Sequence, residues 1–154
     1  MISLHTAESV SAEIKTRVSR CTLAQGAETN LAATVFQGRR HVDETMIPCV
    51  TIVEADDTPS RVRVSDEYEI AQRYVVFAYV PCSANDPNIA AHAAIRDIKR
   101  ALFLTDGRAD VRLGGKVRML DYLGKDIGPR ADGAAFVVVA VEVVAHFVER
   151  ISAP

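Results

Sequence analysis

Hydrophobic residues recur along the chain at helical spacing in two segments. Between residues 6 and 25 apolar side chains return every three or four positions, which predicts a helix with one buried stripe. Thr6 is suited to cap this helix and Gly26 to end it. A second helix is predicted to begin at Pro87, because Asp favours the N-cap position and Pro favours the first helical position. The inner stripe of the second helix consists of Ala91, Ala94, Ile95, Ile98 and Leu102.

The remaining apolar segments alternate with polar residues or run continuously over short lengths, as β-strands do. Strands are predicted at residues 31–36, 49–53, 61–64, 67–80, 116–122 and 134–149. Turn-forming residues are dense at 56–60 and 124–133, so turns are predicted there. The order helix, strands, helix, strands predicts an α+β fold with a mostly antiparallel sheet and two helices packed on one face.

Length and charge restrict the kind of protein. The 154 residues suit one domain, so a single domain is predicted over 1–154. The net charge of −2 is unlike that of a nucleic-acid-binding domain, and no specific nucleic-acid partner is expected. The apolar run 134–148 is too short for a membrane helix and contains Glu142, so no membrane partner is expected. Three widely spaced cysteines predict free thiols and a cytosolic folding compartment.

The residue patterns of catalytic and metal sites are missing from the sequence. The four histidines and three cysteines do not have the spacing of metal ligands, so neither a metal nor a cofactor is expected. The glycines at 114 and 115 precede a predicted strand rather than a helix, which argues against a phosphate loop. Cys82 is the one candidate nucleophile, and it would need a base such as His41 or His92 nearby in space. We therefore expect no enzyme, with a small enzyme using Cys82 as an alternative.

Charged residues in loops and in one strand are the remaining candidates. Arg39 and Arg40 form a short basic loop, and Asp56 and Asp57 lie in a predicted turn. Glu142 interrupts an apolar strand, and burying its carboxylate alone would be costly. We expect Glu142 to face water or to pair with an arginine or a neighbouring subunit.

Several segments of the chain follow one another in a characteristic order. They are the amphipathic first helix, the loop from Gly38 to Pro48, the strand 50–54, the strand ending at Val80 and Pro81, the helix 95–103, and the turn 122–133 before the Val-rich last strand. Together these segments resemble the tail terminator family of long-tailed bacteriophages, also called tail completion or minor tail proteins. The resemblance extends over roughly residues 14–148.

The resemblance implies a structural role in a phage or prophage particle. Members of the family are α+β wedges that form a six-membered ring at the head-proximal end of the tail tube. The ring stops tube polymerisation and offers a face to the head connector. The implied partners are other copies of the chain in a homohexamer, the tail tube protein and the head completion or connector protein. The protein would assemble in the bacterial cytoplasm and remain at the head–tail junction of the virion.

The family has no catalytic residues, so the expected functional residues are contacts between subunits. As a hypothesis, these contacts come from loops at the ends of the sheet and from the one charged strand position. The candidates are Arg39, Arg40, Asp56, Asp57, Arg130, Asp132 and Glu142. Opposite charges across one subunit boundary would fix register more than they add affinity. Other neck, connector or tail tube subunits are the alternative structural roles.

Overall fold

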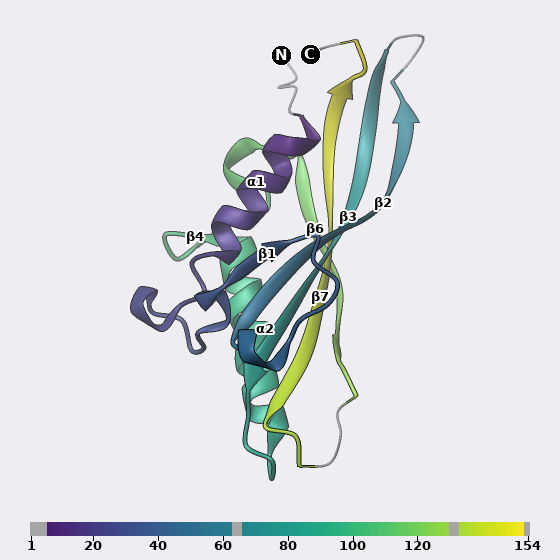
Figure 1. Cartoon of the computed structure of the whole chain (residues 1–154). Coiled ribbons are helices and arrows are strands. Elements are labelled where there is room, and N and C mark those ends of the chain that lie inside the picture. The colour runs from purple at the N-terminus through teal and green to yellow at the C-terminus, as the bar shows by residue number, and fades with distance from the viewer. Residues whose placement is uncertain (1–5, 63–65, 130–132, 153–154) are drawn as a thin grey trace.

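The computed structural model describes residues 6–62, 66–129 and 133–152, and its centre is a five-stranded sheet (Figure 1). The strand order is β1-β2-β3-β7-β6. β1 is parallel to β2, and the other neighbours are antiparallel. The strands are β1 (Val35–Gln37), β2 (Cys49–Arg61), β3 (Glu67–Pro81), β6 (Met119–Ile127) and β7 (Phe136–Arg150). The predicted α+β fold with a mostly antiparallel sheet is confirmed.

Two helices, α1 (Ala7–Val18) and α2 (Pro87–Phe103), lie on one face of the sheet (Figure 1). We call this the inner face and the opposite one the outer face. Thr6 caps α1 as predicted, because its hydroxyl accepts the backbone N–H of Ser9 at 3.2 Å. α2 begins at Pro87 as predicted, but the Asp86 side chain makes no cap hydrogen bond.

The first helix is shorter than its sequence pattern predicts. α1 ends at Val18, and the chain then turns into a short 3-10 helix, Leu23–Gln25. Leu23 is 61% exposed, so the buried stripe does not continue far enough to hold a longer helix against the sheet. Gly26 has a φ of 89° and ends the short helix rather than α1.

The turn predicted at residues 56–60 is wrong, because these residues belong to β2. β2 pairs with β3 from Cys49 to Arg61, with a register shift between Glu54 and Asp57. β1 pairs only with the first part of β2, so Pro59 lies in an edge strand, where its missing N–H is tolerated. At the upper right of Figure 1, β2 and β3 extend beyond the helices as a long arm.

Other boundaries also differ from the prediction, among them those of β1 and β6. Residues 31–33 form a 3-10 helix, and only Val35–Gln37 form β1. β6 continues to Ile127, past the start of the turn predicted at 124, with a register shift between Tyr122 and Gly124. In both places the pairing partner decides the boundary, and that partner is distant in sequence.

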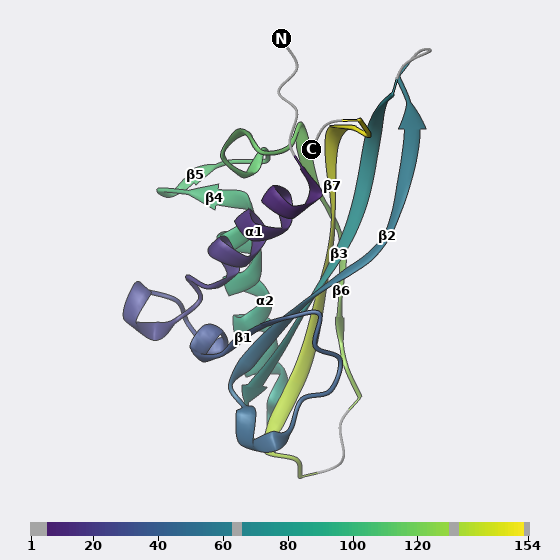
Figure 2. The same ribbon diagram turned by 45° about the horizontal axis from the view of Figure 1, so that its top comes forward.

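The core lies between the inner face and the helices. Alternate residues of β7 are buried, as the sequence predicts, and pack with the apolar stripe of α2. These β7 residues are Val137, Val139, Val141, Val143, Ala145 and Phe147. A small hairpin, β4 (Leu104–Thr105) and β5 (Arg108–Ala109), projects beside the helices (Figure 2). Within the described part of the chain no helix covers the outer face.

Candidate assembly surfaces

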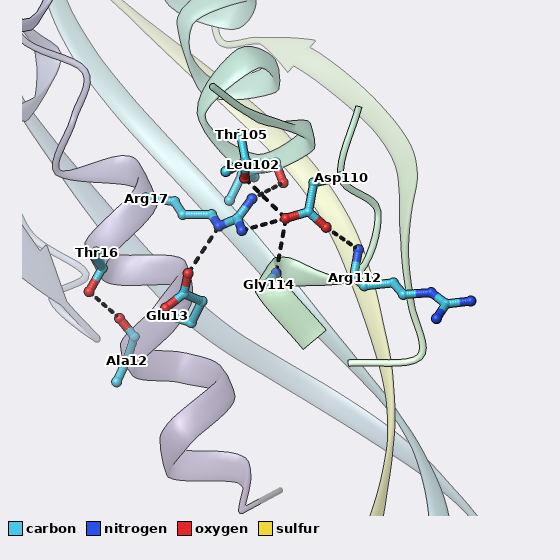
Figure 3. A network of polar contacts seen from close by, with 9 residues as sticks. All are labelled: Ala12, Glu13, Thr16, Arg17, Leu102, Thr105, Asp110, Arg112 and Gly114. Carbon is cyan, nitrogen blue, oxygen red and sulfur yellow. Dashed lines mark hydrogen bonds and ion pairs between the residues drawn. The ribbon is translucent and has the colours of Figure 1, made fainter. Parts of the chain in front are cut away.

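A buried arginine ties the helices to the segment that follows them (Figure 3). The Arg17 side chain is 2% exposed, and its Nη2 contacts a carboxylate oxygen of Asp110 at 2.7 Å. Its Nε donates to Glu13 at 3.1 Å, and its Nη1 donates to the carbonyl of Leu102 at 3.5 Å. One guanidinium therefore joins α1, the end of α2 and the loop after β5.

Asp110 completes this network from the other side (Figure 3). Its carboxylate accepts the Thr105 hydroxyl at 3.0 Å and the backbone N–H groups of Arg112 and Gly114, each at 2.9 Å. The Arg17 hydrogen bond and these further donors hold the pKa of Asp110 well below its ordinary value. Every partner belongs to this chain, so we assign the network to stability rather than to binding.

A second arginine joins two of the predicted interface residues on the outer face. Arg73 contacts Asp56 at 2.7 Å and Glu142 at 3.4 Å. Glu142 thus pairs with an arginine, which is one of the alternatives that the sequence left open. The Arg73 side chain is 40% exposed, and the pKa of Asp56 is lowered by its hydrogen bonds with Arg73. Asp57 lies beyond the register shift, paired with Gln72 in the sheet.

The predicted basic loop folds over the same outer face at the β1–β2 edge. The Thr51 hydroxyl donates to the carbonyl of Arg39 at 2.7 Å. The Arg39 guanidinium lies 4.6 Å from the centre of the Phe36 ring, a cation–π contact. Together these contacts bring both arginines over the sheet. Here they line a hollow of about 160 Å³ with Thr51, Val53, Phe77 and Tyr79.

Four of the predicted site residues therefore fall into two places on the outer face, whereas Asp57 is paired with the buried Gln72 of the inner face. Arg39 and Arg40 lie at the β1–β2 edge, and Asp56 and Glu142 meet at Arg73. Arg130 and Asp132 lie outside the described residues. Arg73 is a candidate that the sequence alone does not indicate. A charged residue on a long strand is common, and only the strand register shows that acidic residues lie beside this one.

The thiols show no catalytic arrangement in the described part of the chain. The Cys82 thiol contacts the carbonyl of Ala134 at 3.8 Å. Burial raises the pKa of Cys21 to about 12 and also raises that of Cys49, which disfavours their thiolates. Among the described residues, no group of three or more acidic, His or Cys side chains is placed to hold a metal. In those same segments no helix has the length and hydrophobicity to cross a membrane.

Comparison with known proteins identifies a similar fold among solved structures. No protein-family model matches the chain, and no curated protein matches it. Among solved structures it is similar to a chain in the "Virion of native gene transfer agent (GTA) particle", with a TM-score of 0.59 and 13% identity. The similarity covers 95% of this chain and 99% of that chain. The two chains therefore share a fold over nearly their whole lengths.

Proposed function

We propose that this protein is a structural subunit of a phage-like virion that forms a ring at the head-proximal end of the tail tube. The supporting observation is the fold match to a chain of a gene transfer agent virion, which leaves almost no part of either chain unmatched. The resemblance of the sequence to tail terminators supports the more specific role. In that role the ring ends tube polymerisation and prepares head–tail joining.

The surfaces of the sheet are compatible with an assembly role. A ring requires a head-to-tail contact that uses two different surfaces of the same chain. The sheet ends in two unlike edges, β1–β2 and β6. β6 bears Met119, Tyr122 and Leu123, which are exposed, and exposed apolar residues on an edge strand favour association. Such a subunit acts by shape and occupied edges and needs no catalytic group.

The test is the mass of the purified protein by light scattering over a wide concentration range, with electron micrographs of the same samples. Closed rings of a single size, without longer stacks, are the expected result. Stacks that lengthen with concentration would instead identify a tube subunit. A compact dimer or a monomer at every concentration would overturn the ring.

A further inference from the structure

The two edges of the sheet run in directions that permit lateral contact between copies. β6 is antiparallel to β7, β7 to β3 and β3 to β2, while β1 is parallel to β2. β6 therefore runs opposite to β1 and β2. If one copy is displaced sideways along the sheet, its β6 lies antiparallel beside the β1–β2 edge of the next copy. Both sheets then keep the same faces inward and outward.

On the outer face, one row of paired residues has opposite charges at its two ends. From β6 to β2 the row consists of Asp126, Ala140, Phe77 and Thr51. Beyond Thr51 the row continues to Phe36 of the edge strand β1. Arg39 of the basic loop lies over the Phe36 ring, and its carbonyl accepts the Thr51 hydroxyl. Asp126 and Arg40 are exposed, and neither side chain forms an ion pair within the described segments. The Asp126 carboxylate and the Arg40 guanidinium thus lie at the same height along the strands, on opposite edges of the sheet.

On the inner face, a second row has the reverse polarity. From β6 to β2 it consists of Tyr122, Val143, Tyr74 and Glu54. At the β6 end, the Lys99 ammonium lies 4.4 Å from the centre of the Tyr122 ring. At the β2 end, Glu54 accepts a hydrogen bond from Ser11. Glu54 borders an open groove of about 630 Å³ beside α1.

The two rows are separated by the same number of residues on β2 and on β7. Thr51 and Glu54 are three residues apart on β2, and so are Ala140 and Val143 on β7. This step is about 10 Å along a strand. One sideways displacement, without sliding along the strands, therefore brings both rows of one copy to the level of those of the next. The outer row meets the neighbour at β1, and the inner row meets it past the end of β1, at β2.

We propose that a second copy of this chain binds side by side, with β6 of one copy next to the β1–β2 edge of its neighbour. Asp126 then faces the neighbour's Arg40 on the outer face. Lys99 faces the neighbour's Glu54 on the inner face. The inference rests on the proposed function, because it supplies the head-to-tail contact that a ring needs. The reversed polarity of the two rows fixes which face of each copy is outward.

Cysteine cross-linking tests the outer contact. Asp126→Cys and Arg40→Cys are made separately in a Cys82→Ser background, which removes the half-buried native thiol. Under mild air oxidation, a mixture of the two variants is expected to form covalent dimers, while each variant alone forms none. Arg108→Cys, on the β4–β5 hairpin, replaces Arg40→Cys as the control and should give none. Dimers of Asp126→Cys alone, or no dimers in the mixture, would overturn the proposal.

Charge exchange tests the inner contact. Lys99→Glu and Glu54→Lys each place like charges at the boundary, so each is expected to weaken self-association about tenfold or more. The double variant restores opposite charges and should recover most of the loss. Arg108→Glu is the matched control and should leave the association constant unchanged. If self-association were as weak in the double variant as in the single variants, with folding intact by circular dichroism, the pairing of Lys99 with Glu54 would be contradicted.

The two experiments separate this inference from the function on which it rests. Suppose that the wild-type protein forms closed rings, but Asp126→Cys does not cross-link to Arg40→Cys and the Lys99–Glu54 double variant does not recover association. The contact is then wrong, and the ring stands. If both pairs behave as expected but the products are open stacks, the contact stands and the capping function is wrong.

Discussion

Arg17 and Arg73 each bind two carboxylates, the first arginine at the core and the second on the surface. Arg17 is 2% exposed and binds Glu13 and Asp110, while Arg73 is 40% exposed and binds Asp56 and Glu142. The pairs of Arg17 are costly to break, because the guanidinium is buried and the carboxylates of Glu13 and Asp110 are only 23% and 19% exposed. An exposed pair is screened and contributes little. The ion pairs of Arg17 therefore stabilise the fold, whereas those of Arg73 leave its side chain available for other contacts.

The largest expected effect comes from removing the buried cation. Arg17→Met leaves the Asp110 carboxylate without its main partner, so the free energy of unfolding should fall by about 3–5 kcal/mol. Urea denaturation followed by circular dichroism measures this loss. A loss below about 1 kcal/mol would show that the network does not hold the helices in place.

A change of pH should act on the same network. The pKa of Asp110 is lowered in the folded protein, so its contribution to stability is complete above its unfolded pKa of about 4. That contribution is lost as the pH falls below about 4 towards the folded pKa. Urea denaturation at pH 6 and pH 3 should show a smaller difference in Asp110→Asn than in the wild-type protein. An unchanged difference would assign the acid sensitivity to other carboxylates.

Removing the exposed cation should cost much less. Arg73→Met breaks the contacts with Asp56 and Glu142, yet both carboxylates keep access to water, so a loss of at most about 1 kcal/mol is expected. The same denaturation experiment, repeated at high salt, should show this small difference shrinking. A loss as large as that of Arg17→Met would remove the distinction between the two clusters.

The smallest effect on stability should come from the basic loop. Changing Arg39→Glu together with Arg40→Glu alters exposed side chains, so the free energy of unfolding should shift by only about 0.5 kcal/mol. Self-association should nevertheless weaken, because the changed loop would repel an acidic neighbour. Light scattering at matched concentrations measures the association. Normal assembly of the doubly changed protein would exclude this loop from the subunit boundary.

The sequence predicts the parts of the fold that burial dictates. The alternation in β7 and the helical stripe of α2 are visible in sequence, because each position is either covered or exposed. The arm of β2 is different. Its residues 56–60 favour turns locally, and only pairing with β3 keeps them extended. The ends of the edge strands and of the arm therefore depend on the strands with which they pair, which the local sequence pattern does not reveal.

The candidate surface residues show the same limit. Glu142 is recognisable because it interrupts an apolar strand, and the sequence offered an arginine as one possible partner. That this partner is Arg73 depends on the register between β3 and β7, which links positions 69 residues apart. Asp126 and Lys99 were missed for the same reason. Their proposed importance comes from rows that cross the whole sheet.

The position of β7 has a consequence for the timing of synthesis. β7 lies between β3 and β6, although it follows both in the sequence. Until Phe136–Arg150 has left the ribosome, β3 has a bare edge and β6 has no strand to join. An incomplete chain therefore presents sheet edges that the finished protein covers, a state that favours aggregation. Only a chain translated through this strand can offer both of its outer edges in their final places.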